Sequence, residues 1–165
     1  MHRISEKLAT HWAIAGGILI LPIMFVSTLN AGAFSLDRLV RIFGESVPAL
    51  PGYEDFVRLM ISCAALMFFP YCQYRKGHIA VDLFTEKFPL VLQNFLDKLW
   101  LVTLLALIIF LAIQMTFGMI ETYQDHALSP ILGWPEWPFY LPGLLSLLFW
   151  AGIVAVQLLN SKNNV

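Results

Sequence analysis

The chain has 165 residues, of which 59% are hydrophobic and 13% are charged, and its formal net charge is -1. Soluble domains carry about 25% charged residues, so half that density leaves too little polar surface for a soluble fold. The near-neutral charge also excludes the basic surface that nucleic-acid binding requires, so no nucleic-acid partner is expected. The composition therefore indicates an integral membrane protein.

Four apolar stretches are long enough to cross a bilayer, because a helix needs about 20 residues to span the hydrocarbon core. They cover residues 12–29, 56–74, 99–120 and 138–159. Pro70 should bend the second helix near its end. The segments between the spans are too short for a soluble domain. We therefore expect an all-α fold with four transmembrane helices in a single membrane domain, residues 1–165.

The first apolar stretch has a competing interpretation as a cleaved signal peptide. Arg3 and Lys7 resemble the basic start of a signal, and residues 31–33 (Ala-Gly-Ala) resemble a cleavage site. The apolar region of a signal peptide is only 7–15 residues long. Because this stretch is longer and contains Pro22, a retained transmembrane helix is the favoured interpretation.

Two amphipathic segments are expected to lie in the membrane interface, one on each side. In residues 34–45, apolar side chains recur with helical spacing opposite charged ones, which predicts an interfacial helix or a plain connecting helix. A second such pattern covers residues 80–95 and leads into the third span, with Pro89 suited to the first position of a helix.

The distribution of Lys and Arg predicts the orientation in the membrane. If the N-terminus lies inside, the inner segments hold seven of the ten basic residues and the outer segments hold three. Since cytoplasmic loops are enriched in Lys and Arg, both termini and the loop at residues 75–82 are expected in the cytoplasm. The outer loop after the third span has no basic residue and carries Glu121, Asp125 and Glu136.

The ionisable side chains of the spans lie at their ends. Glu54 and Arg58 are four residues apart, which favours an ion pair, although Arg58 is also a candidate contact to another subunit. No carboxylate lies in the middle of a span, which argues against an autonomous ion-coupled transporter. Gln114 is expected to hydrogen-bond between helices, with ligand binding as the alternative.

Motifs for redox, metal or hydrolytic chemistry are absent from the sequence. Cys63 and Cys72 are nine residues apart on one expected helix, about 13 Å of rise, which is too far for a disulfide and predicts free thiols. Of the four histidines, only His11 borders a span, so a facing haem-ligand pair is not expected. We expect no enzymatic activity, no catalytic or metal-binding residues and no cofactor.

Two sequence motifs resemble those of a known family. A loop motif comprises Gly77, His78, Ile79, Val81 and Asp82, and a later motif comprises Ser129, Leu132, Gly133, Pro135, Trp137, Tyr140 and the following Pro142. Together with Glu54 at the start of the second span, they make the chain similar to the small membrane subunit, of the DctQ or SiaQ type, of tripartite ATP-independent periplasmic (TRAP) transporters.

The resemblance implies a function in transport. The small subunit would pair with a large membrane subunit that holds the substrate and sodium sites, and a periplasmic binding protein would deliver the substrate. The system would import organic acids, such as C4-dicarboxylates or sialic acid, across the bacterial inner membrane. This chain would be a scaffold without substrate-binding residues of its own.

Three further hypotheses follow from the sequence. Glu121, Asp125 and Glu136 could form a docking surface for the binding protein, or could simply keep the loop solvated. An independent oligomeric four-helix exporter or channel is one alternative function. A quinone- or haem-linked membrane anchor is the other.

Overall fold

The computed structural model describes residues 2–75 and 89–161. All the regular elements in these ranges are helices, which confirms the all-α fold. They are α1 (His2–Val40), η1 (Arg41–Phe43), α2 (Tyr53–Met67), α3 (Phe69–Tyr74), α5 (Leu90–Gln124), η2 (Trp137–Phe139) and α6 (Tyr140–Ser161).

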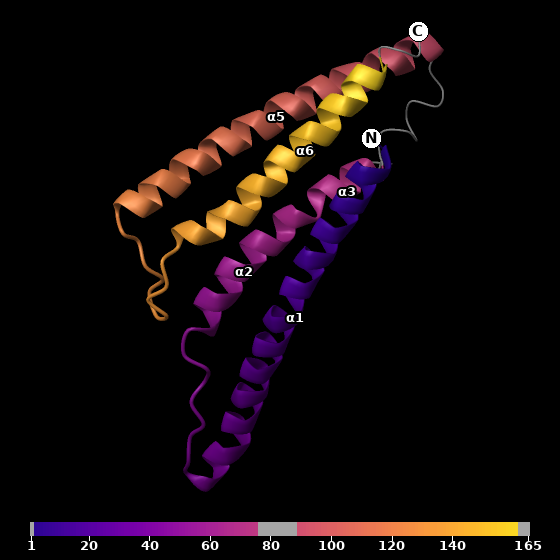
Figure 1. Cartoon of the computed structure of the whole chain (residues 1–165). Coiled ribbons are helices and arrows are strands. Elements are labelled where there is room, and N and C mark those ends of the chain that lie inside the picture. The colour runs from indigo at the N-terminus through magenta and orange to yellow at the C-terminus, as the bar shows by residue number, and fades with distance from the viewer. Residues whose placement is uncertain (1, 76–88, 162–165) are drawn as a thin grey trace.

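The long helices lie side by side in one layer rather than around a common core (Figure 1). The helices α1 and α2 form one hairpin and α5 and α6 form the other, and α2 and α3 pack against α6 where the hairpins meet. The order across the layer is therefore α5, α6, α2 with α3, and α1. We call the end with residues 41–52 and 125–137 the loop end, and the opposite end the terminal end.

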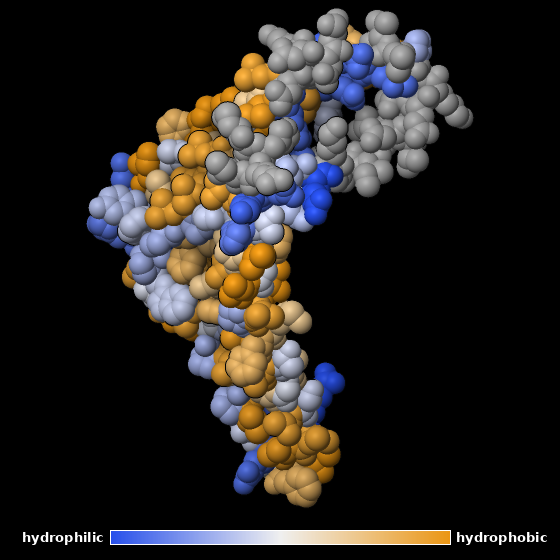
Figure 2. Space-filling view, turned by 45° about the vertical axis from the view of Figure 1, so that its right-hand side comes forward, coloured by the Kyte–Doolittle hydropathy of each residue, from blue (hydrophilic) through white to orange (hydrophobic). Residues whose placement is uncertain are grey.

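The four expected spans are confirmed as helical segments long and apolar enough to cross a membrane: Glu6–Phe43, Tyr53–Tyr74, Leu92–Gln124 and Trp137–Leu159. Only 11% of the most apolar window of the third segment is buried, and only 33% in the fourth. Figure 2 shows hydrophobic side chains along the helices, with hydrophilic ones gathered mainly towards the ends. Most apolar side chains therefore face outwards, where lipid or another protein would cover them.

The predicted break between the first span and a separate amphipathic helix at residues 34–45 is wrong. The helix α1 runs for 39 residues without interruption, through Pro22, and ends in the short η1 turn and Gly44 at φ 83°. The supposed break contains two alanines, which favour helix. The Asn30 side chain does not end the helix but accepts a hydrogen bond from the Leu50 N–H (3.2 Å), which holds the returning chain against α1.

The second predicted amphipathic segment lies partly outside the described residues, since residues 80–88 are not described. Its remainder is continuous with the third span, because α5 begins directly after Pro89 and runs to Gln124. The second span is interrupted between α2 and α3 at Phe68, with Pro70 in the first turn of α3. The helix is therefore interrupted next to Pro70, where a bend was expected.

Small residues let the helices approach closely where the layer is best packed. A Cβ at Gly16 of α1 would lie 2.9 Å from the Met67 Cβ, and a Cβ at Gly143 of α6 would overlap Met115 and Leu66. The α5–α6 hairpin has its own buried core of Leu104, Ile108, Leu147, Trp150 and Val154. Close backbone approach is the usual basis of helix association in membranes, where lipid tails are as apolar as the helix surfaces.

Candidate functional site

The late sequence motif folds into a closed turn, residues 129–134, at the loop end. The Ser129 N–H donates to the Trp134 carbonyl (2.8 Å), and the Trp134 N–H donates to the Ser129 Oγ (3.1 Å). Gly133 has φ 65°, in the left-handed region that favours glycine, and its N–H donates to the Ser129 carbonyl (3.0 Å). The motif residues Ser129 and Gly133 therefore set the shape of this turn.

Asp55 of the first hairpin holds this turn of the second hairpin. Its Oδ2 accepts hydrogen bonds from the N–H groups of Ile131 (2.7 Å) and Leu132 (3.2 Å), and the residue is 6% exposed. Its position in the first turn of α2 also favours a negative charge, because of the helix dipole. The role of Asp55 depends on a partner 76 residues away, which no local sequence pattern indicates.

Leu132 packs against Gly52, the residue that precedes α2. Gly52 has φ 80°, and a Cβ there would lie 2.7 Å from the Leu132 Cδ2. A larger residue at position 52 would therefore be strained and would also displace Leu132. The motif leucine therefore contacts the start of the second span twice, through its N–H to Asp55 and through its side chain to Gly52.

Arg58 forms an ion pair with Glu136, so the expected pair with Glu54 is wrong. The guanidinium donates to the Glu136 Oε1, and the two side chains are 55% and 22% exposed. Glu54 is exposed and accepts a hydrogen bond from the Tyr53 hydroxyl (3.1 Å) instead. The turn brings Glu136 to Arg58 from the other hairpin, which local helix spacing could not indicate.

Aromatic side chains fill the space around the turn. Trp134 packs edge-on against Phe56, with ring centroids 6.3 Å apart, and stacks on Phe139. The motif residue Trp137 packs edge-on against Tyr123 at 5.6 Å. These contacts add apolar burial to the hydrogen bonds that join the two hairpins.

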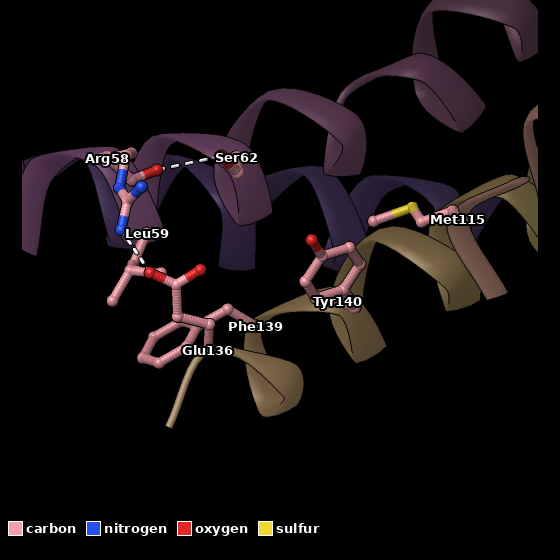
Figure 3. A pocket seen from close by; sticks show the side chains of 7 residues that line it. All are labelled: Arg58, Leu59, Ser62, Met115, Glu136, Phe139 and Tyr140. Carbon is pink, nitrogen blue, oxygen red and sulfur yellow. Dashed lines mark hydrogen bonds and ion pairs between the residues drawn. The ribbon is translucent and has the colours of Figure 1, made fainter. Parts of the chain in front are cut away.

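A pocket of about 330 Å³ lies beside the ion pair (Figure 3). It is lined by Arg58, Leu59, Ser62, Met115, Glu136, Phe139 and Tyr140. The two charged side chains bind each other, and the Ser62 hydroxyl donates to the Arg58 carbonyl (2.9 Å). The pocket lining therefore combines one ion pair, one serine and one tyrosine with apolar side chains.

A second polar junction joins the hairpins at the terminal end. The Gln73 amide of α3 donates to the Gln157 Oε1 of α6 (2.7 Å), and the Gln157 amide donates to the Gln73 carbonyl (3.2 Å). The Trp150 indole donates to the Gln73 Oε1 (3.3 Å). Gln73 is 4% exposed, so its amide is buried and bonded. Gln73 and Gln157 are 84 positions apart, so no local sequence pattern indicates this cluster.

The remaining motif residues have structural contacts or lie outside the described part. The Pro142 carbonyl accepts from the Ser146 hydroxyl (2.7 Å), which accepts from the Trp12 indole of α1 (2.8 Å). Pro135 pairs with Leu128 in an isolated bridge, and Tyr140 contributes to the pocket. The loop motif Gly77, His78, Ile79, Val81 and Asp82 lies outside the described residues.

The three acidic residues expected in the outer loop differ in their position and environment, because Glu121 lies in the last turn of α5. Glu121 and Asp125 are exposed, whereas Glu136 is engaged by Arg58. The cysteines Cys63 and Cys72 are free, as predicted, and the Cys63 thiol donates to the Phe139 carbonyl (3.1 Å). Within residues 2–75 and 89–161, no three His, Cys, Asp or Glu side chains come together as a metal site.

The helices and their junctions define a multi-pass membrane protein of two helical hairpins. The family model "Tripartite ATP-independent periplasmic transporters, DctQ component" matches residues 35–162. The chain therefore belongs to this family, which confirms the resemblance found in the sequence. No curated protein and no solved structure matches the chain.

Proposed function

We propose that this chain is the small permease subunit of a sodium-driven TRAP importer of organic acids, of the C4-dicarboxylate or sialic acid type. It acts as a scaffold for a large membrane subunit that holds the substrate and sodium sites. Membership of the DctQ family supports a role as one component of a multi-subunit transporter. The location is the bacterial inner membrane.

The observation that carries the scaffold role is the single layer of helices with uncovered apolar faces. A layer one helix thick encloses no path for a substrate, and the polar groups where the hairpins meet are bonded to each other. Such a layer offers a large lateral surface to a partner. An exporter or channel would need several copies to enclose a pore.

The positions of the described histidines do not favour a haem-linked anchor. His11 is on α1 towards the terminal end and contacts the Lys7 carbonyl through Nδ1, whereas His126 follows α5 at the loop end. A haem bound between two histidines needs both rings to face one another within the same part of the fold. The scaffold therefore remains the better supported function.

The proposed orientation places the terminal end in the cytoplasm. Arg75 follows α3 there, and its hydrogen bond to the Tyr71 hydroxyl raises the pKa of Arg75 above its already high ordinary value. A permanently charged residue at this end agrees with the enrichment of basic residues in cytoplasmic segments. The loop end, where Asp125 is exposed, then meets the periplasmic binding protein.

Reconstitution into liposomes tests the proposal. Under a sodium gradient, labelled C4-dicarboxylate or sialic acid should enter only when this chain, the large subunit and the binding protein are all present. The chain alone should give no flux at any protein density. Substrate flux through the chain alone, or full uptake by the large subunit and binding protein without it, would contradict the scaffold role.

Cysteine labelling tests the orientation. In a chain carrying Cys63→Ser and Cys72→Ser, a His126→Cys variant should react with an impermeant reagent added from the periplasmic side. Ser retains a hydroxyl donor where the Cys63 thiol contacts the Phe139 carbonyl. Reaction only from the cytoplasmic side would show that the orientation is inverted.

A further inference from the structure

One stripe of α5 has the spacing of a helix-pairing seam. Its members alternate four and three residues apart, and the structure leaves each of them exposed: Thr103, Leu107, Phe110, Gln114, Phe117 and Glu121. This alternation of four-residue and three-residue steps is the spacing that keeps one helix in continuous contact with another. We call these six residues the α5 seam.

The second hairpin does not cover the α5 seam with its own helix. Contact with α6 is made by Leu104 and Ile108, which are buried in the hairpin core. Because successive residues turn by about 100°, the seam lies about 120° around α5 from this pair. The helix α5 is also at the edge of the layer, so no further described helix lies beyond it (Figure 1).

Gln114 is the polar residue that lies between Phe110 and Phe117 on the seam. Its side chain is exposed and forms no hydrogen bond with the described part of the chain. The hydroxyls of Thr103 and Thr116 on the same helix are satisfied, because they donate to the carbonyls of Leu99 (2.9 Å) and Ala112 (2.7 Å). The primary amide of Gln114 therefore stands out as an unpaired group.

The depth of Gln114 prevents it from reaching water easily. It precedes Glu121, the next charged residue of α5, by seven residues, which is about 10 Å along the helix. Side chains of a helix tilt towards its N-terminus, so Gln114 is directed away from the loop end and deeper into the apolar zone. An amide left unpaired in hydrocarbon is strongly unfavourable, so another molecule must supply its hydrogen-bond partner.

Charge argues against a second copy of this chain as that partner. Two copies inserted in the same direction would pair Gln114 with Gln114, but would also place Glu121 opposite Glu121. Two facing carboxylates repel each other, so a helix of different sequence fits the seam better. Lipid tails would cover the apolar members but cannot hydrogen-bond to the amide.

We propose that the α5 seam is the docking surface for a transmembrane helix of the large subunit, which presents a hydrogen-bonding side chain to Gln114 and a cationic or donor group to Glu121. This inference rests on the proposed function, because it names the face by which the scaffold holds its partner. Phe110 and Phe117 flank Gln114 on the seam and supply the apolar contact.

Site-specific photo-crosslinking in membranes that contain the complete transporter tests the seam. A benzoylphenylalanine replaces Phe110 or Phe117, and the matched controls carry it at Ile109 or Ile113. These two isoleucines are each 49% exposed but lie on the neighbouring stripe of α5, outside the seam. The seam positions should give adducts with the large subunit, and the control positions should not.

A copurification readout separates this inference from the proposed function. If the large subunit fails to copurify with the unmodified chain, the proposed function is wrong and the inference falls with it. If the complex forms but adducts arise only from Ile109 and Ile113, or equally from all four positions, the seam assignment alone is wrong. Adducts between two copies of this chain would also contradict the seam assignment and would indicate self-association instead.

The contribution of the amide is tested by Gln114→Leu, with Ile113→Leu as the control. The amount of large subunit retained in detergent should fall by about threefold to tenfold with Gln114→Leu, as expected for one hydrogen bond between membrane helices. Gln114→Asn should restore part of it. Full retention with Gln114→Leu would overturn the role of the amide. Because the residue is exposed in the isolated subunit, the thermal midpoint of the chain alone should not change.

Discussion

The same two hairpins are joined by two polar junctions of different chemistry. At the loop end, the ionised Asp55 binds backbone N–H groups of the 129–134 turn, and Arg58 pairs with Glu136. At the terminal end, neutral amides of Gln73 and Gln157 bond to each other. The loop-end junction contains a carboxylate because a helix N-terminus and backbone N–H groups stabilise its negative charge. The terminal-end junction has no such groups and contains neutral amides instead.

The two junctions also differ in what they require of the chain. The loop-end junction depends on the shape of a turn, because Asp55 binds main-chain N–H groups that Ser129 and Gly133 hold in place. The terminal-end junction requires two particular side chains on straight helices. We therefore expect the first to fail when the turn or its acceptor is changed, and the second when either amide is removed.

The largest effect is expected from Asp55→Ala, which removes the acceptor of two backbone hydrogen bonds. The turn should detach from α2, so that protease cleavage within residues 125–137 accelerates and the thermal midpoint in detergent drops most of all. Asp55→Asn keeps one acceptor oxygen and should lose less. An Ala variant with unchanged cleavage and midpoint would show that Asp55 does not hold the turn.

A smaller loss is expected at the terminal end from Gln157→Leu. It leaves the NH2 group of the Gln73 side chain buried without its acceptor, which should cost about 1–3 kcal/mol of stability. The double variant Gln73→Leu with Gln157→Leu should lose less than the sum of the single changes, because no unpaired amide remains between them. Strict additivity in a double-mutant cycle of unfolding free energies would contradict a direct interaction.

Breaking the Arg58–Glu136 pair should have a weaker effect, because the Arg58 side chain is 55% exposed. Arg58→Met should lower the unfolding free energy by about 0–1 kcal/mol, with the difference from the parent shrinking as salt is raised. Glu54→Gln is the control, since Glu54 does not contact Arg58, and it should have no salt-dependent effect. If Glu54→Gln lowered the unfolding free energy equally and in a salt-dependent way, Glu54 would be the partner of Arg58, as expected from the sequence.

The smallest effect, on the rate of uptake alone, is expected from an acidic residue that neither junction nor the α5 seam uses. Asp125→Lys should slow uptake at limiting binding-protein concentration and low ionic strength, because exposed charges act mainly on encounter. Salt or saturating binding protein should remove the difference. Uptake by Asp125→Lys equal to that of the parent at low salt would leave solvation as the role of this carboxylate.

The sequence predicted those features that local composition determines. Hydropathy located the four spans. The Asp55–Ile131 and Gln73–Gln157 contacts join residues 76 and 84 positions apart, and no periodicity encodes such pairs. The first span was expected to end near residue 29, where Ser27, Thr28 and Asn30 make the sequence polar, but α1 continues without a break to Val40.

The single layer of helices also determines where the chain can vary in sequence. In a compact bundle, each helix buries a broad face, but here burial is confined to narrow lines between neighbours, such as Ile108 with Val154. Apolar exchanges on the open faces should therefore be widely tolerated outside the partner contacts. A map of substitution tolerance should show two thin intolerant bands along the hairpins, joined by crossing points at Asp55 and Gln73.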